Sequence, residues 1–361
     1  MIYMARPSIG KEEKDAVLSV LDSGIITEGK VTREFEKKFA EFVGSKFAVA
    51  TDSGTSALHI SLLCHNIGNG DEVITTPFTF VASVNSIKFV GAKPVFVDID
   101  EDTFNIDPSL IEEKITDKTK AILPVHLYGN PCDVGRINKI AKKHNLVVIE
   151  DACQAHGSSI GVHSVGSVNT TCFSFHPTKN MTTAMGGMLT TNDEHIAKLA
   201  TKLKLCGESD FYYYDVLGYN YRMTNVNAAI GLEQLKKLPE FNRKRRENAG
   251  YFNENINVKG IVLPKVDKNS KHVYHQYTIR VTNNCSKTRD EIIKLLRSNE
   301  IFPQVYYPLP IHKQKLYEKD YDNESYPVTE RICNEVLSLP VHPSLTQEDL
   351  SKIVDVLNGI R

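Results

Sequence analysis

The chain has 361 residues, and 41% of them are hydrophobic. This hydrophobic fraction is enough for one large core and a smaller one, and it is not the composition of a disordered protein. Its 43 Lys and Arg residues nearly balance its 44 Asp and Glu residues, which argues against a surface built to bind nucleic acid or an anionic membrane. The N-terminus has no leader-like pattern and no stretch is long and apolar enough for a membrane helix, so we expect a cytoplasmic location.

In chain order, two helical patterns come first, at 11–21 and 31–42. Between 45 and 192, short β-rich runs alternate with helical stretches such as 56–64 and 134–144. This alternation predicts an α/β fold, with βαβ units around a mostly parallel seven-stranded sheet flanked by helices. The expected strands are 47–50, 72–76, 94–97, 121–125, 146–149, 171–175 and 187–191.

The pattern changes after Gly231. A charged helical stretch at 235–255 leads to β-type runs at 276–281 and 304–307 and to helices near 289–299 and 347–357. We therefore expect a large domain over 1–239, which includes the N-terminal helical segment, and a smaller C-terminal α+β domain over 240–361.

Seven cysteines are scattered along the chain without a Cys-x-x-Cys pair. Their odd number and their spacing fit neither a disulfide framework nor a zinc site. We expect reduced, mostly buried thiols and no bound metal.

A carboxylate and a lysine follow two of the expected strands. The run that ends in Glu150-Asp151 brings Asp151 to the carboxyl edge of the sheet, where α/β proteins bind ligands. A second run leads into Pro177-Thr-Lys179, which can reach the same edge. Singly, such residues are mostly structural or solvated. Together they supply an amine that can form an imine and an acid that can keep a pyridine nitrogen protonated, which pyridoxal phosphate (PLP) chemistry requires.

The loop Asp52-Ser-Gly-Thr-Ser56 lies between an expected strand and an expected helix. Its backbone N–H groups, its hydroxyls and the helix N-terminus can hold a phosphate. An ordinary N-cap is the simpler interpretation, because the loop matches neither the P-loop nor the dinucleotide pattern.

Several segments together resemble the DegT/StrS family of PLP-dependent nucleotide-sugar aminotransferases, which has the aspartate aminotransferase (type I) fold. The resemblance extends over nearly the whole chain, and the joint order and spacing of the motifs make it specific. The matching segments are Ser53-Gly-Thr-Ser-Ala-Leu58, Phe78-Thr-Phe-Val-Ala82, Gly91-Ala-Lys-Pro-Val-Phe-Val-Asp98, Pro124-Val-His-Leu-Tyr-Gly129, Glu150-Asp-Ala-Cys-Gln-Ala-His-Gly157, Phe173-Ser-Phe-His-Pro-Thr-Lys-Asn180, Gly218-Tyr-Asn-Tyr-Arg-Met223 and Tyr306-Tyr-Pro308.

The resemblance implies a role for each residue around the cofactor ring. Lys179 would form the imine with PLP and then move the proton during transamination. Asp151 would pair with the pyridine nitrogen, and Gln154 would approach the ring hydroxyl. Phe80 would stack on the ring, although an isolated aromatic residue is more often part of a core.

The resemblance also implies how the phosphate is held. Gly54, Thr55 and Ser174 would form the cradle, and Asn220 would reach in from a neighbouring subunit. A homodimer with shared active sites follows from that last contact. Arg222 is a candidate for the interface or for a substrate carboxylate, and a structural ion pair is an equal alternative.

Five further residues lie in segments that resemble the sugar-facing loops of the family. Hydroxyl and imidazole groups there can bond a hexose or its diphosphate, whereas a lone His or Tyr is otherwise more often packed and satisfied. These residues are His126, Tyr128, Tyr306, Tyr307 and His312.

Two segments depart from the family pattern. After Thr183, relatives usually have Gly followed by an acid, whereas this chain has Ala184-Met185 before Gly186. Phe302-Pro-Gln304 replaces residues that are commonly smaller. Both departures bear on substrate choice more than on the chemistry at Lys179.

The resemblance implies a ping-pong transaminase that takes an amino group from an amino acid, by analogy L-glutamate, and transfers it to a nucleotide-linked keto-deoxy sugar. One alternative is a PLP-dependent sugar dehydratase, which carries His in place of the lysine, so His176 needs attention. A second is a non-catalytic binding or regulatory protein of the same fold. A third is an aminotransferase for amino acids, which needs an arginine for the substrate carboxylate, with Arg222 and Arg280 as candidates.

Overall fold

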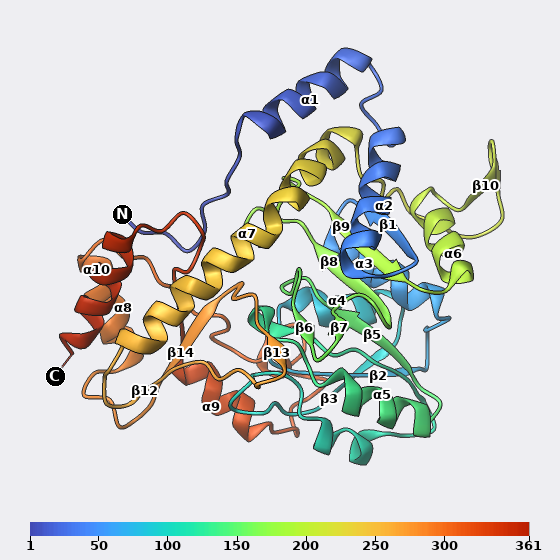
Figure 1. The fold of residues 1–361 in the computed structure, drawn as a ribbon. Helices are drawn as coiled ribbons and strands as arrows, with labels where there is room; N and C mark the ends of the chain where they lie inside the picture. Colours follow the sequence, from blue (N-terminus) through green and yellow to red (C-terminus); the bar gives the residue numbers. More distant parts are fainter. Residues whose placement is uncertain (361) are drawn as a thin grey trace.

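The computed structural model describes residues 1–360, and a seven-stranded sheet forms its centre (Figure 1). The strands lie in the order β1-β9-β8-β5-β4-β2-β3, and only β9 runs antiparallel to its neighbours. The predicted number of strands and their mostly parallel direction are confirmed. Their bounds are β1 Phe47–Thr51, β2 Glu72–Thr75, β3 Lys93–Phe96, β4 Thr119–Ile122, β5 Val147–Asp151, β8 Thr170–Ser174 and β9 Gly187–Thr191.

Helices cover both faces of the sheet, because its apolar strands present side chains to both sides. On one face lie α3 (Gly54–Cys64), α4 (Val81–Phe89) and α6 (Glu194–Lys204). The other face is covered by α2 (Lys30–Val43), α5 (Val134–Lys143) and part of α7.

The side chains of strand β8 alternate between the two faces of the sheet. Cys172 points into the core beneath α3, whereas Phe173 and Phe175 point the other way and meet α2. The ring centroids of Phe39 and Phe173 are 5.0 Å apart, and those of Phe35 and Phe175 are 5.3 Å apart. These aromatic pairs fix α2 against the sheet.

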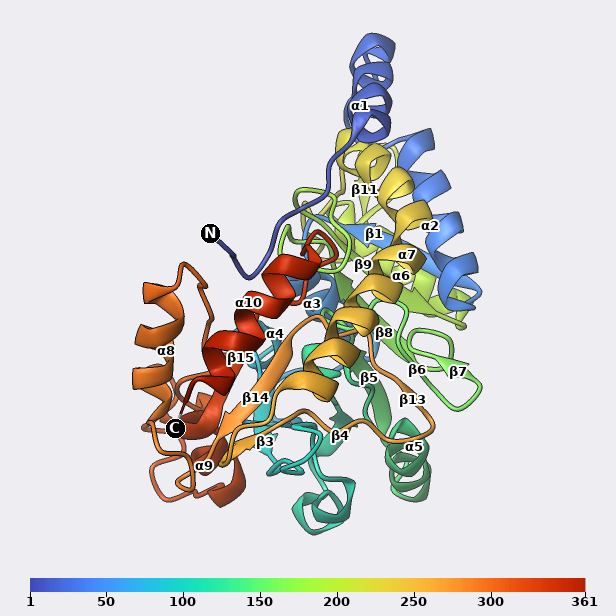
Figure 2. The same ribbon diagram turned by 60° about the vertical axis from the view of Figure 1, so that its left-hand side comes forward.

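The longest helix, α7 (Asn225–Asn255), runs from the large sheet to the C-terminal part of the chain (Figures 1 and 2). It begins before the predicted start at 235, because Thr224 caps it by accepting a hydrogen bond from the Asn227 amide at 3.1 Å. Gly231 lets it approach α2, since a Cβ at that position would lie 2.7 Å from the Phe35 ring. Helix α1 (Lys11–Ser23) packs along α7.

A second core lies beneath a three-stranded antiparallel sheet in the C-terminal part of the chain. Its strands are β12 (Ile261–Val262), β14 (Tyr277–Val281) and β15 (Val336–Leu339), and β14 is in the middle. Helices α8 (Arg289–Ser298) and α10 (Gln347–Asn358) cover it. Because α7 crosses position 239 without a break, the division into 1–239 and 240–361 stays a prediction.

The predicted strand at 304–307 is wrong. This segment forms only an isolated bridge between Gln304 and Ser338, and the third strand of the small sheet is β15. Pro303 and Pro308 flank the segment, and proline cannot donate to a strand ladder.

The remaining elements are short or peripheral. They are β6 (Ser159–Ile160), β7 (His163–Ser164), β10 (Glu208–Asp210), β11 (Tyr213–Tyr214), β13 (Ser270–Lys271), α9 (Pro327–Glu335) and the 3-10 turns η1 (Pro108–Leu110), η2 (Glu112–Lys114), η3 (Leu127–Gly129) and η4 (Ile311–Lys313). Within residues 1–360, no helix has both the length and the apolar character needed to cross a bilayer.

Candidate active site

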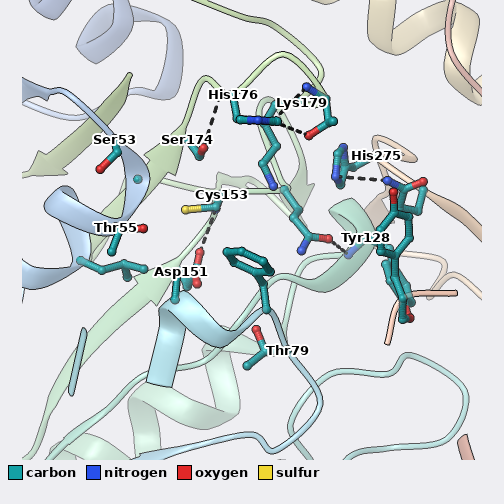
Figure 3. Close-up of a pocket in the computed structure, with 18 of the residues that line it drawn as sticks. Ser53, Thr55, Thr79, Tyr128, Asp151, Cys153, Ser174, His176, Lys179 and His275 are labelled. Carbon is teal, nitrogen blue, oxygen red and sulfur yellow. Dashed lines mark hydrogen bonds between the residues drawn. The ribbon is translucent and has the colours of Figure 1, made fainter. Parts of the chain in front are cut away.

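A cavity of about 540 Å³ lies at the carboxyl edge of the large sheet (Figure 3). Strands β1, β5 and β8 all end there, so the loops that follow them line the same space. The segments expected to carry chemistry therefore meet in one place, although they are far apart in sequence.

The loop after β1 forms one wall and contains the N-terminus of α3. Ser53 is the N-cap, and its hydroxyl accepts a hydrogen bond from the Ser56 amide at 3.1 Å. A Cβ on Gly54 would lie 2.7 Å from the Ser174 Cβ and 2.8 Å from the Cys153 sulfur, so only glycine fits. The first-turn amides and the hydroxyls of Thr55 and Ser174 provide donors that an anion can use.

Asp151 is the last residue of β5 and is 5% exposed. Its Oδ1 accepts a hydrogen bond from the Cys153 amide at 3.0 Å, and its Oδ2 accepts one from the Ser83 hydroxyl at 2.7 Å. Both bonds require an acceptor, which fits an ionised carboxylate. The carboxylate borders the cavity, where a cationic group can approach it.

Lys179 lies in the loop between β8 and β9, and its side chain extends into the cavity (Figure 3). The side-chain amide of the adjacent Asn180 fixes this loop, because its Nδ2 donates to Asn242 Oδ1 at 2.8 Å and to the Val273 carbonyl at 3.0 Å. Burial lowers the pKa of the Lys179 amine, and the nearby Cys153 and Asp151 oppose that shift. A lowered pKa increases the neutral fraction of the amine, which is its nucleophilic form.

Three imidazoles near Lys179 are held neutral. Burial, with a contribution from the Lys179 charge, lowers the pKa of His156 to about 3 and also lowers the pKa values of His176 and His275. None of the three can therefore act as a cationic partner at neutral pH. His176 and His275 line the cavity, whereas His156 packs against Phe173 and Phe175.

Gln154 lies opposite the lysine and is fixed at both ends of its amide. Its Oε1 accepts a hydrogen bond from the Tyr128 amide at 2.8 Å, and its Nε2 donates to the Tyr307 hydroxyl at 3.3 Å. Phe80, by contrast, is 55% exposed and borders the cavity with a free ring face. An exposed aromatic ring beside an open cavity is suited to stacking on a planar ligand.

Most of the predicted site residues border this cavity. They are Gly54, Thr55, Phe80, Tyr128, Asp151, Gln154, Ser174, Lys179, Tyr306 and Tyr307. Met185 borders it as well, in a loop where Ala184 has a left-handed backbone with φ 65°.

Besides two arginines, five of the residues considered from the sequence lie outside the lining of the cavity. His126 is fully buried, where it bonds Glu150 at 2.7 Å and accepts from the Cys132 amide at 2.9 Å. His312 is 2% exposed and contacts Glu330 at 3.2 Å. Neither imidazole is open to a sugar in this chain. The other three are Asn220, Phe302 and Gln304.

Two arginines considered for a substrate carboxylate have other contacts. Arg280 pairs with Glu101 at 3.2 Å and with Glu335 at 3.7 Å, away from the cavity. Arg222 is exposed, and its Nε donates to Asn220 Oδ1 at 3.0 Å. Neither residue lines the cavity of its own chain, and the ion pairs of Arg280 argue against a role for it in binding a substrate carboxylate.

Sequence reasoning missed several residues of the cavity. Thr79 and Cys153 stand beside predicted site residues, and their positions in the motifs could have indicated them. His275 and Gln276 come from the C-terminal part of the chain and carry no signal in the sequence.

Known proteins resemble this chain over almost its whole length. The model of the DegT/DnrJ/EryC1/StrS aminotransferase family matches residues 7–358. The GDP-perosamine synthase of Escherichia coli O157:H7 is 40% identical, with 99% of this chain and 98% of the relative covered. The dTDP-3-amino-3,6-dideoxy-alpha-D-galactopyranose transaminase of Aneurinibacillus thermoaerophilus is 41% identical, with 96% and 95% covered.

Solved structures share the fold over almost the whole chain. DesV of S. venezuelae superposes with a TM-score of 0.93 at 34% identity, covering 96% of this chain and 93% of that one. The PLP-form of Spr1654 from Streptococcus pneumoniae superposes with a TM-score of 0.92 at 30% identity, covering 99% and 97%.

Proposed function

The chain belongs to the DegT/DnrJ/EryC1/StrS aminotransferase family, and we propose that Lys179 is the catalytic residue of a ping-pong transfer from L-glutamate to a nucleotide-linked keto-deoxy sugar. The protein is a PLP-dependent nucleotide-sugar transaminase of the type I fold. The observation that carries the residue assignment is the convergence of Lys179, Asp151 and the N-terminus of α3 on one cavity.

The residues of the cavity fit PLP at each of its functional groups. The amides and hydroxyls around Gly54, Thr55 and Ser174 suit the phosphate, and the missing Cβ of Gly54 lets the first turn of α3 pack against Ser174 and Cys153. Asp151 suits the protonated pyridine nitrogen, and the Phe80 ring suits the flat face of the cofactor. When bound, PLP supplies an electron sink for the carbon that carries the amino group.

We assign Gln154 to the ring hydroxyl of PLP. Its Nε2 is the end of the amide that faces Tyr307, and its Oε1 is occupied by the Tyr128 amide. The fixed orientation leaves a donor directed at the cavity, which suits a phenolate oxygen.

Lys179 carries the proton transfer in this proposal. With PLP and substrate bound, the Lys179 amine would be placed to take a proton from one substrate carbon and to return it to another position. The burial that lowers its pKa favours the neutral base at the pH of the cell. A general acid or base contributes about 10²–10⁴-fold to a rate.

The proposal includes a cytoplasmic homodimer whose two sites are shared. Asn220 is exposed, and it lies in the segment that pairs with Leu205 and follows the hairpin of β10 and β11. That hairpin carries an exposed run of aromatics, Phe211, Tyr212, Tyr213 and Tyr214. Exposed aromatic clusters are typical of contact surfaces. Reduced cysteine thiols suit a reducing compartment.

The two alternatives in the same fold are less well supported. A sugar dehydratase carries His where this chain has Lys179, and His176 lies at the edge of the cavity with a lowered pKa rather than at the lysine position. A binding protein has no need for an amine directed into the cavity opposite a carboxylate. The names of two relatives contain GDP-linked and dTDP-linked sugars. Keto sugars linked to GDP or to dTDP are therefore the first acceptors to screen.

The first experiment is the absorption spectrum of the PLP-loaded protein before and after addition of L-glutamate without any sugar. We expect the yellow band of lysine-bound PLP to convert to the band of the pyridoxamine form. D-Glutamate is the control for stereochemistry, and Lys179→Ala is the control for the residue. A bound cofactor that L-glutamate leaves unchanged would contradict the donor, and a normal yellow band in Lys179→Ala would contradict the residue.

A further inference from the structure

The carboxylate of Asp151 has a hydroxyl group on its far side from the cavity. Ser83, on α4, is 1% exposed, and its Oγ lies 2.7 Å from Asp151 Oδ2. An ionised carboxylate can only accept hydrogen bonds, so the Ser83 hydroxyl is the donor. The amide of Cys153 donates to the other oxygen at 3.0 Å, so each oxygen has one protein donor.

A second hydroxyl extends this contact in one direction. Thr79, which is 2% exposed and borders the cavity, has its Oγ1 2.9 Å from Ser83 Oγ. The single proton of the Ser83 hydroxyl is already directed at Asp151, so Thr79 donates to Ser83. The result is a directional chain from Thr79 to Ser83 to Asp151, which we call the hydroxyl chain.

No cationic side chain of the described residues forms an ion pair with Asp151. Among residues 1–360, Asp151 forms no ion pair. Several titratable groups surround Asp151. Burial raises the pKa values of the cysteines and the tyrosine among them, so these side chains are neutral near pH 7. Lys179 is the single amine of this set. These groups are Cys132, Cys153, Cys172, Lys179 and Tyr307.

We propose that Ser83 and Thr79 are positioning residues, which hold Asp151 ionised and aimed at the pyridine nitrogen of PLP. The inference rests on the proposed role of Asp151. A hydrogen bond to a carboxylate stabilises its charged form, and hydrogen bonds in a buried chain polarise one another. Without the Ser83 donor, one oxygen of the buried carboxylate has no hydrogen-bond partner in the protein, and the carboxylate is less firmly aimed at the ring.

The test compares Ser83→Ala with a matched control from the same helix. Ser86 is also buried, but its hydroxyl donates to the Ser83 carbonyl at 2.8 Å rather than to Asp151, so Ser86→Ala removes an equal group without touching the hydroxyl chain. The readouts are the dissociation constant of PLP for the apoprotein and the pH midpoint at which the absorption of bound PLP changes. Neither depends on turnover.

We expect Ser83→Ala to weaken PLP binding by about 10-fold, which corresponds to the loss of one hydrogen bond to a charged group. The pH midpoint should shift as well, because the carboxylate that faces the ring nitrogen is less firmly held. Ser83→Thr should restore both values, and Thr79→Val, which keeps the shape of the side chain, should change both in the same direction by a smaller amount. Ser86→Ala should leave both values unchanged.

Two outcomes separate this inference from the proposed function. If wild-type protein binds PLP and both Ser83→Ala and Thr79→Val match it in affinity and in pH midpoint, the hydroxyl chain has no such role. If Asp151→Ala also leaves PLP binding unchanged, the error lies in the proposed role of Asp151 itself. Thermal unfolding of each apoprotein variant separates a loss of fold from a loss of binding, and Thr79→Val decides the case in which Ser83→Ala does not fold.

Discussion

Among single residues, Lys179 experiences two opposed influences. Burial disfavours its charged form, whereas Asp151 and Cys153 favour it, and burial is the stronger effect. In the unfolded chain nothing lowers the pKa of this amine. Between the folded pKa and its usual value of 10.5, the unfolded chain therefore binds more protons, and the free energy of unfolding rises with pH.

This argument predicts that Lys179→Met abolishes transamination and at the same time stabilises the apoprotein at neutral pH. The gain should be greatest below the folded pKa, where the buried amine is charged, and should disappear above 10.5. Urea unfolding of the apoprotein across a pH series measures it. Lys271→Met is the control, because Lys271 is exposed. A variant that is less stable than wild type at neutral pH would show that the lysine is not under this penalty.

The sequence indicates some residues of the site and not others. Asp151 and Lys179 were predicted because each follows a recognisable strand, and parallel strands end at one edge. Ser83 was not, because its role depends on which face of α4 turns toward β5. His126 lies in a family motif, but whether an imidazole faces a cavity or a buried Glu150 depends on the neighbouring strand, which the local sequence does not specify.

At the level of elements, the N-terminus of α3 depends on one glycine. The calculated approach of a Gly54 Cβ to Ser174 and Cys153 means that an alanine must push β8 and α3 apart or distort the first turn. Either change moves the amides that would hold the phosphate.

We therefore predict that Gly54→Ala weakens PLP binding by about 10-fold or more, as measured by titration of the apoprotein. Gly250→Ala is the matched control, because Gly250 lies in α7 and a Cβ there meets no atom within 4 Å. That control should bind PLP normally and gain about 0.5–1 kcal/mol of stability from the better helix former. Equal PLP affinity in both variants would mean that the phosphate is held elsewhere.

Elements with a strong local pattern were predicted and weaker ones were not. The seven strands of the large sheet consist mainly of apolar or β-branched residues, so they could be found without a period of two. The segment at 304–307 carries the same composition and yet forms no strand. Its neighbour β15 was missed, because four buried residues after a helix give too short a signal.

At the scale of the whole molecule, the expected dimer contact can be tested directly with variants of Asn220. In a single chain Asn220 is exposed and does not line the cavity, which agrees with a role in the site of a second copy. We predict that Asn220→Ala alone retains PLP less well than wild type, as measured by dilution or dialysis.

Mixing this variant with Lys179→Ala distinguishes contact within a chain from contact between chains. A mixed dimer has one complete site if Asn220 acts across the interface, because the intact lysine and the intact asparagine then come from different chains. After the two variants are dissociated and reassembled together, we expect the transaminase activity at limiting PLP to exceed that of either variant alone. No recovery in verified mixed dimers would contradict a shared site.

Helix α7 has a further consequence for the evolution of the cavity. Asn242 anchors the lysine loop through Asn180, and Arg245, on the same helix, holds the neighbouring segment of the lining by donating to the carbonyls of Tyr274 and His275 at 3.0 and 3.3 Å. Inserting one residue between these anchors would turn one of them by about 100° about the helix axis. The placement of these two lining segments relative to each other thus depends on helical register, so the loops can change to accommodate new substrates, whereas the length of this segment of α7 cannot.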